Sequence, residues 1–249
     1  MRRRLFTATI ADGAAETESA LAELPVEFHA VPVSKIVQVC GSEALDRVFA
    51  RLRDFDWIFF SSANAASIFL EHAPPSAHDI APRIACVGPN TADFVERMGF
   101  AVSLVSEVHT GVALAEEFIA RHGQEHPSVL LPRPEKMGGD LAERLTAAGI
   151  PVTQLVLYRT DPLDADAAQA LTFCDSDLFV FMSPSGVKHF TRLYPMPAKA
   201  TAIAIGPTTA AALAAVGHAN VVTAERACRE GLLDTVTSIL NNSSEPEGC

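Results

Sequence analysis

Two serine residues that follow short apolar runs are the first candidates for chemistry in this sequence. Ser62 follows the run 57–60, and Ser183 follows the run 178–181. A helical pattern begins soon after each serine, and the first amides of a helix lack partners within that helix. A hydroxyl beside such amides suits an anionic ligand. Serine at such a junction also commonly caps the helix, so this second role stays open for both residues.

Two Gly-Pro pairs mark further junctions of the same kind. Apolar runs end at Gly88-Pro89 and again at Gly206-Pro207, and each pair is followed by a helical pattern. Glycine permits a tight exit from a strand, and proline suits the first turn of a helix. We expect the amides just beyond the second pair to be free for an anion, with the helix beginning at Thr208. The residues at the two junctions are Thr91 in the first copy and Thr208, Thr209 and Ala210 in the second.

The two sets of junctions belong to an internal duplication. Gly88 and Gly206 are 118 residues apart, and so are Gly99 and Gly217. The segment around Ser62 matches the segment around Ser183, and a weaker pair joins residues 4–33 to residues 128–159. The order is therefore a short unit, a long unit, a short unit and a long unit. Hydroxyls that recur in both copies favour ligand binding over capping alone.

Strands alternate with helices throughout the chain, which is typical of parallel sheets with helices on both faces. The apolar patterns predict strands at 4–10, 26–33, 36–40, 57–60, 84–87, 102–105, 129–131, 152–158 and 201–205. Helices are predicted at 14–24, 45–52, 64–71, 92–98, 112–122 and 141–148. The fold class is α/β with two lobes, each a doubly wound, flavodoxin-like parallel sheet. If the chain crosses between lobes at 32–35 and 158–162, residues 1–33 with 161–249 form lobe one and residues 34–160 form lobe two, joined by a two-stranded linker.

Ligands of doubly wound sheets bind outside the carboxyl ends of the strands. Two lobes with such ends facing each other would enclose an inter-lobe cleft. Arg133 and Lys136 lie in one strand exit, although charge in a loop often serves solvation alone. Tyr158 lies at the second crossing and would otherwise be an ordinary interface tyrosine.

Composition limits the class of partner. The formal net charge is −11, which argues against broad contact with nucleic acid or an anionic membrane. No apolar run approaches the roughly 20 residues of a membrane span. Five scattered cysteines without a CxxC motif predict reduced thiols and a cytoplasmic location.

One short motif is a weak indication of a metal site. His122 and His126 fit an HxxEH metal pattern, but Gly123 and Pro127 indicate a helix end there, so the imidazoles would not share one helical face. The sequence also has no glycine-rich nucleotide-binding motif.

Another interpretation is a two-lobe sugar- or nucleotide-transferring enzyme. Such an enzyme would need an acidic metal motif at a strand end, and the nearest candidate is residues 161–164, which lie in the linker.

The ordered motifs resemble the uroporphyrinogen-III synthase family. The resemblance extends from about Leu5 to Leu240 and is carried by FFSSANAA, VGPNTADFVERMGF, LLPRPEKMGGDLAERLTAAGIPV, VLYRT, FMSPSGV, AIGPTTAAAL and EGLLDTV. Two places depart from the family pattern. Thr7-Ala8-Thr9 stands where Thr-Arg-Pro is usual, and Arg133-Pro134 stands where Arg-Gly is usual.

The resemblance implies a HemD-like, cofactor-independent lyase of tetrapyrrole biosynthesis that uses no metal. Such an enzyme closes hydroxymethylbilane, a linear tetrapyrrole, to uroporphyrinogen III with loss of water and inversion of ring D. It also implies a monomer with the substrate in the inter-lobe cleft. Tyr158 would be the catalytic acid, and the substrate-binding residues would be Ser62, Ala63, Thr91, Arg133, Lys136, Ser183, Pro184, Ser185, Thr208 and Thr209. The alternative from another class is a non-catalytic two-lobe sensor that binds an anion or a tetrapyrrole.

Overall fold

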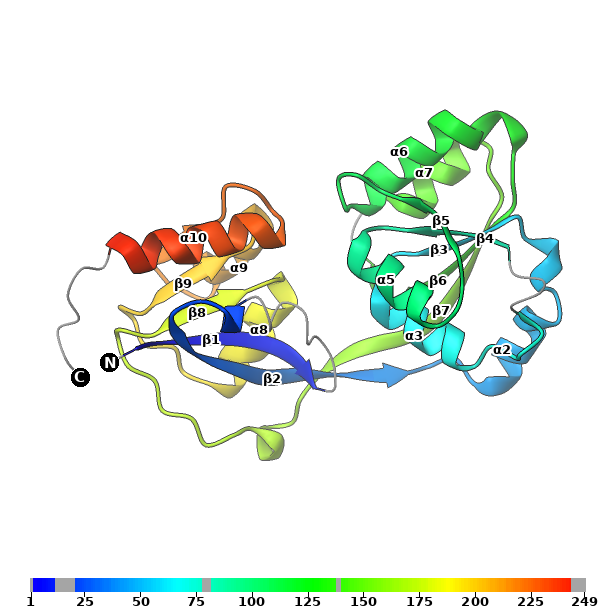
Figure 1. Ribbon diagram of the computed structural model, residues 1–249. Coiled ribbons are helices and arrows are strands. Elements are labelled where there is room, and N and C mark those ends of the chain that lie inside the picture. The colour runs from blue at the N-terminus through cyan, green and yellow to red at the C-terminus, as the bar shows by residue number, and fades with distance from the viewer. Residues whose placement is uncertain (1, 12–20, 78–81, 138–139, 243–249) are drawn as a thin grey trace. The chain divides into compact units, whose positions relative to one another are not determined.

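The computed structural model describes residues 2–11, 21–77, 82–137 and 140–242. The chain divides into two compact units (Figure 1). Unit 1 comprises residues 1–36 and 161–249, and unit 2 comprises residues 37–160. The predicted crossings lie within a few residues of these divisions, and whether each unit folds alone stays a prediction.

Unit 1 is built around a parallel sheet with the strand order β2-β1-β8-β9-β10. Its strands are β1 (Arg3–Ala11), β2 (Val26–Gln38), β8 (Leu178–Phe181), β9 (Thr201–Ala204) and β10 (Val221–Thr223). Its helices are α8 (Pro184–Leu193), α9 (Pro207–Ala215), α10 (Arg229–Asn242) and the short η3 (Ala165–Ala167). Counted along the chain, the order is 2-1-3-4-5, which is the flavodoxin-like doubly wound order.

Unit 2 has a parallel sheet with the order β7-β6-β3-β4-β5. Its strands are β3 (Trp57–Phe60), β4 (Arg83–Cys86), β5 (Val102–Val105), β6 (Val129–Pro134) and β7 (Val152–Pro162). Its helices are α2 (Ser42–Phe49), η1 (Leu52–Asp54), α3 (Ala63–Glu71), α5 (Pro89–Arg97), α6 (Gly111–His122), η2 (Gly123–Glu125) and α7 (Leu141–Ala147). The spatial order is the same as in unit 1 if the pair β6–β7 takes the place of β1–β2. The pair comes first in unit 1 and last in unit 2, as the short-long repeat requires.

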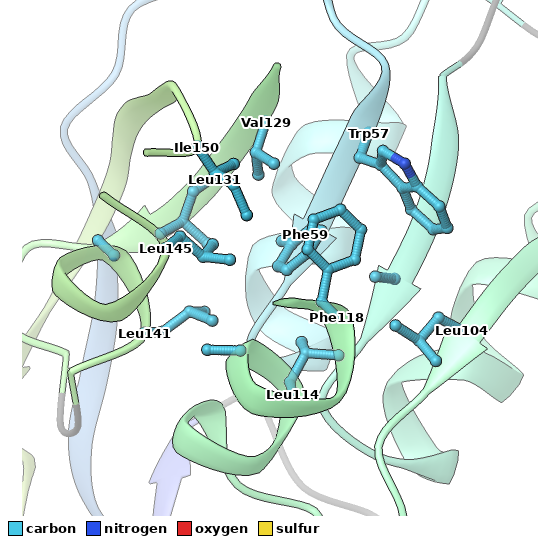
Figure 2. Packing of buried hydrophobic residues seen from close by; sticks show 13 residues of the cluster. Trp57, Phe59, Leu104, Leu114, Phe118, Val129, Leu131, Leu141, Leu145 and Ile150 are labelled. Carbon is cyan, nitrogen blue, oxygen red and sulfur yellow. The ribbon is translucent and has the colours of Figure 1, made fainter. Parts of the chain in front are cut away.

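Helices cover both faces of the unit 2 sheet because its central strand is apolar on both sides. Trp57 and Phe59 of β3 point to one face, where they pack against α6 and α7 (Figure 2). Phe60 points to the other face and contacts Phe69 of α3, which in turn contacts Phe49 of α2. This alternation follows from the two-residue period of a strand. The predicted doubly wound α/β fold is therefore confirmed.

Unit 1 is layered in the same way. Phe179 and Phe181 of β8 pack with α8 and α9 on one face, whereas Val180 packs with α10 on the other. Phe190 of α8 contacts both phenylalanines, with ring centroids 5.5 Å apart in each pair. Among the described residues, no helix has the length and apolar character that crossing a membrane requires.

Strand β2 differs from its prediction as two separate strands. It runs without interruption from Val26 to Gln38, through Pro32. Pro32 pairs with Thr9 of β1 at a point where the register shifts by one residue. Proline has no amide hydrogen to donate, and such irregular positions are where a sheet tolerates it. Strand β7 is also longer than predicted and extends to Pro162.

Two helices begin earlier than the sequence predicts. Helix α5 starts at Pro89 instead of residue 92, and α9 starts at Pro207 instead of Thr208. The fixed φ of proline fits the first helical position in both cases. Most of the helix predicted at 14–24 lies outside the described residues.

Candidate active site

A cavity of about 240 Å³ lies at the carboxyl ends of the unit 2 strands. It is lined by Ser61, Ser62, Val87, Gly111, Pro134, Lys136, Met137, Leu141 and Tyr158. These residues end β3, β4 and β6, belong to β7 or begin the helices that follow. Strands β6 and β3 are neighbours although one long unit separates them in the sequence. The cavity therefore occupies the switch point at which doubly wound sheets bind ligands.

Ser62 holds the first turn of α3. Its backbone is extended, with φ −162° and ψ 152°, and its Oγ accepts a hydrogen bond from the amide of Ala65 at 3.2 Å. Capping was the alternative role at this position, and the structure shows it. Capping does not exclude ligand contact, since the same residue lines the cavity. Ala63 follows as the first residue of the helix.

Tyr158 is buried on β7, and 5% of its surface is exposed. Its Oη lies 3.2 Å from Ser62 Oγ. Because Ser62 Oγ already accepts the Ala65 amide, the serine can donate its own hydrogen to Tyr158, which leaves the phenol hydrogen available to a ligand. Burial raises the pKa of the phenol, and hydrogen bonds with Ser62 and Asn64 offset part of the rise.

Asn64 was missed by the sequence predictions. It lies in the first turn of α3, two residues after Ser62, and it contributes to the pKa of Tyr158 through a side-chain hydrogen bond. An amide side chain two residues beyond a cap is a common helix feature, so the sequence alone carried no signal for this contact. The contact depends on β7 lying close to the start of α3.

The two predicted cations of the β6 exit have different surroundings. Lys136 is exposed and lines the cavity. Arg133 does not line it, and its Nη1 donates to the carbonyl oxygens of Pro134 at 2.7 Å and of Glu135 at 2.9 Å. Arg133 Nε is buried and has no hydrogen-bond partner among the described residues.

The two Gly-Pro junctions have glycine caps, so Thr91 and Thr209 are not N-caps. Gly88 and Gly206 precede α5 and α9, and both threonines lie in the first turn with 4% and 1% of their surface exposed. The prediction of free amides at Thr209 and Ala210 is wrong, since both donate to the Gly206 carbonyl, at 3.1 and 3.0 Å. These bonds form because α9 starts one residue earlier than predicted.

The matching junction of unit 1 has the same cap as Ser62. Ser183 Oγ accepts the amide of Gly186 at 3.1 Å and lies 3.1 Å from Ser185 Oγ. Pro184 is the first residue of α8. Ala8, at one of the departures from the family pattern, lies within β1 beside Gly186. A second hollow in unit 1, of about 350 Å³, contains none of the predicted residues and is lined by Leu171, Thr172, Phe173, Pro195, Met196 and Pro197.

Three of the predicted site residues therefore share one cavity in unit 2, namely Ser62, Lys136 and Tyr158. Ala63, Thr91 and Arg133 belong to the same unit, whereas Ser183, Pro184, Ser185, Thr208 and Thr209 belong to unit 1. A substrate cleft that uses both groups stays a prediction.

The HxxEH motif is divided by the end of a helix, as predicted. Helix α6 stops at His122, and His126 has a left-handed backbone with φ 47°. Within the described residues, no three His, Cys, Asp or Glu side chains are grouped so that they could hold a metal ion.

The chain is similar to known proteins over most of its length. The family model of uroporphyrinogen-III synthase HemD matches residues 15–234. A chloroplastic uroporphyrinogen-III synthase of Oryza sativa subsp. japonica is 29% identical over 93% of this chain and 80% of its own. A porphyrin biosynthesis protein HemD of Ruminiclostridium josui is 25% identical over 86% of this chain. That alignment spans 44% of the Ruminiclostridium protein, so the chain corresponds to less than half of that relative.

A solved structure shares the fold. The crystal structure of uroporphyrinogen-III synthetase from Helicobacter pylori 26695 matches with a TM-score of 0.65 and 19% identity, over 96% of this chain and all of that one. At this identity the match shows the α/β fold alone. The family model covers far more than half of the sequence, and the chain therefore belongs to the uroporphyrinogen-III synthase HemD family.

Proposed function

We propose that this chain converts hydroxymethylbilane to uroporphyrinogen III, with loss of water and inversion of ring D. The family membership supports the reaction class. The observation that carries the proposal to particular residues is the buried Tyr158 hydroxyl, 3.2 Å from Ser62 Oγ, on a cavity at the carboxyl ends of the unit 2 strands.

Tyr158 acts as the general acid for the departing hydroxyl. The hydroxyl of the terminal hydroxymethyl group leaves as water when its oxygen takes the phenol proton, and the methylene carbon remains on the pyrrole as an electron-poor azafulvenium cation. The raised pKa keeps the phenol protonated at neutral pH, so the proton is present when the substrate binds. Ser62 then stabilises the phenolate by donating its hydroxyl hydrogen. The proton returns to Tyr158 when the newly closed pyrrole loses a hydrogen and becomes aromatic again.

Positioning decides which isomer forms. Attack by the substituted carbon of ring D gives a spiro intermediate that fragments and recloses as the type III product, whereas free substrate closes at the unsubstituted carbon and gives type I. Holding ring D in the reactive geometry can lower a barrier by several kcal/mol. Strand ends and helix starts form the walls of the cavity and would hold the ring.

The substrate carries an acetate and a propionate on each pyrrole, so local groups must bind it against a net charge of −11. Lys136 supplies a cation on the cavity. We assign Ser62, Ala63, Thr91 and Lys136 to the part of the substrate held by unit 2. Ser183, Pro184, Ser185, Thr208 and Thr209 would hold the part that reaches unit 1 across an inter-lobe cleft.

We also propose that the chain acts as a monomer in the cytoplasm. Each unit covers both faces of its own sheet with helices, and the exposed large apolar side chains among the described residues are scattered valines at 39, 105, 108 and 216. Cys40 and Cys86 are buried free thiols, which fits a reducing compartment. Light scattering after gel filtration and cell fractionation test these two statements.

Incubation of the purified chain with hydroxymethylbilane, without added metal or cofactor, tests the function. The product is oxidised to porphyrin, and its isomers are separated. We expect mostly type III, and a mixture equal to the spontaneous type I background would overturn the proposal. A sensor would instead bind the substrate, as seen by a shift in melting temperature, and leave the isomer ratio unchanged.

A further inference from the structure

The side chain of Arg133 folds back onto the loop that follows its own strand. Its Nη1 donates to two successive carbonyl oxygens, of Pro134 at 2.7 Å and of Glu135 at 2.9 Å. Hydrogen bonds from a charged donor are stronger than neutral ones, so this pair fixes the direction of both peptide groups. A single guanidinium nitrogen therefore holds the turn from β6 into the loop.

The same loop is tied to Tyr158 through Glu135. The amide of Glu135 donates to the carbonyl oxygen of Tyr158 at 2.7 Å. Pro134 is paired with Tyr158 across β6 and β7, just after a register shift between Arg133 and Pro134. The Glu135 amide faces β7 as the Val129 amide does earlier in the same strand, where it donates to the Pro151 carbonyl at 2.8 Å. Glu135 is thus held on both sides, by Tyr158 through its amide and by Arg133 through its carbonyl.

The loop forms a wall of the cavity, and Arg133 does not. Pro134, Lys136 and Met137 line the cavity together with Tyr158. Arg133 contacts the carbonyls behind that wall, and its Nε is buried without a partner among the described residues. The guanidinium therefore acts on the cavity indirectly, by fixing the loop that lines it.

We propose that Arg133 is a positioning residue that fixes loop 133–136, and thereby places Lys136 and the Tyr158 hydroxyl on the cavity. This inference rests on the proposed function. It replaces the expectation that Arg133 binds the substrate and leaves that contact to Lys136, three residues further along the chain.

The test compares Arg133→Met with Lys136→Met. Both variants lose one positive charge and keep an aliphatic side chain, so they form a matched pair. The background carries Tyr194→Phe, because the chain has two tyrosines and Tyr158 then gives the single tyrosine signal in ¹³C NMR. Steady-state kinetics supply kcat and KM for each variant.

We expect Arg133→Met to lower kcat by about 10²-fold, because small misplacements of a reacting group have effects of this size. It should also shift the Tyr158 signal in the absence of substrate. Lys136→Met should raise KM and leave the Tyr158 signal unmoved. If Arg133→Met raises KM alone and the tyrosine signal stays in place, Arg133 contacts the substrate directly and the proposal is overturned.

The remaining outcomes also decide the matter. Unchanged kinetics and an unchanged tyrosine signal in Arg133→Met would show that the loop does not need the guanidinium. If that variant does not fold, Arg133→Lys keeps a donor within reach of the carbonyls, so kcat and the Tyr158 signal should stay close to wild type; a fall in kcat with an unmoved Tyr158 signal would overturn the proposal. Failure of the wild-type chain to form the type III isomer would overturn the proposed function, whereas the tyrosine signal tests the coupling by itself.

Discussion

Replacing Tyr158 with phenylalanine separates catalysis from packing. The change removes one hydroxyl and keeps the ring, which is 5% exposed and stays packed. The hydrogen bonds with Ser62 and Asn64 are lost, but Ser62 still caps α3 through the Ala65 amide. Loss of each hydrogen bond costs about 0.5–1.5 kcal/mol of stability. At about 2–4 °C per kcal/mol for a chain of this size, the melting temperature falls by about 2–12 °C.

The expected effect on turnover is larger. General acid assistance is typically worth about 10²–10⁴-fold, which corresponds to about 3–5 kcal/mol of transition-state stabilisation. We therefore expect kcat for type III formation to fall at least about 10²-fold, while the spontaneous type I product accumulates in its place. Stopped-time assays with isomer separation measure both products. Because burial raises the pKa of Tyr158 above its ordinary value near 10, wild-type kcat should show no loss of the acid between pH 6 and pH 9.

Tyr194→Phe is the matched control. The Tyr194 hydroxyl accepts the amide of Gln169 at 2.9 Å in unit 1, so the same atom is removed from a buried tyrosine outside the cavity. We expect a similar loss of stability with unchanged kcat. If Tyr158→Phe retains wild-type turnover, or if both variants lose turnover equally, the reasoning about the acid is refuted.

Three further predictions concern the fold. Hydrogen bonds from the amide and hydroxyl of Ser128 lower the pKa of Asp56. The carboxylate therefore stabilises the fold above pH 4, and this contribution is lost as the pH falls through the lowered pKa. Asp56→Asn should cost about 1 kcal/mol or less of stability at pH 7 and make the melting temperature depend less on pH between pH 5 and pH 2. Gly231→Ala should destabilise the chain by about 1–3 kcal/mol in denaturant titration, because a Cβ there would overlap the Arg226 carbonyl. A fragment of residues 34–160 should unfold cooperatively on its own, as measured by circular dichroism, because its sheet is complete within these residues.

Each of these predictions has a distinct contrary result. If the melting temperature of Asp56→Asn falls below pH 5 as steeply as that of the wild type, the Ser128 contacts do not stabilise the carboxylate. Gly41→Ala is the control for the glycine, since no atom lies within 4 Å of a Cβ at that position, and an equal loss in both variants would contradict the overlap. An aggregated fragment would show that the two units depend on each other.

The sequence predicts the strand-helix order well because the duplication repeats each signal. Ser62 and Ser183 were recognised as a pair from their apolar runs, and both cap the following helix. Pro32 was correctly placed inside a strand, but the strand was predicted to end at Val33 and resume at Ile36, whereas β2 continues through Ser34 and Lys35, which pair with β1 after a register shift. The Gly-Pro junctions were placed correctly, but both helices begin at the proline, earlier than predicted, with glycine as the cap.

The candidate site was harder to predict because its contacts join distant segments. Ser62 and Tyr158 are 96 residues apart, and they meet because β6 lies between β7 and β3. No local pattern encodes that order. Arg133 and Lys136 are both cations in one loop, and the sequence could not show which of them turns back onto carbonyl oxygens.

The position of β1 in unit 1 has a consequence for synthesis on the ribosome. β1 pairs with β2 on one edge and with β8 on the other. Leu5 pairs with Leu178, so this second edge of β1 stays unpaired until a segment 173 residues downstream has been made. At about 5–20 residues per second, that wait is roughly 10–35 s. The whole of unit 2 is made within this interval, and its sheet can form while β1 and the first part of β2 still have an unpaired edge. Exposed strand edges invite pairing with other chains. The nascent chain is therefore most vulnerable at β1 and the first part of β2, which are the segments that a chaperone would need to shield until β8 emerges.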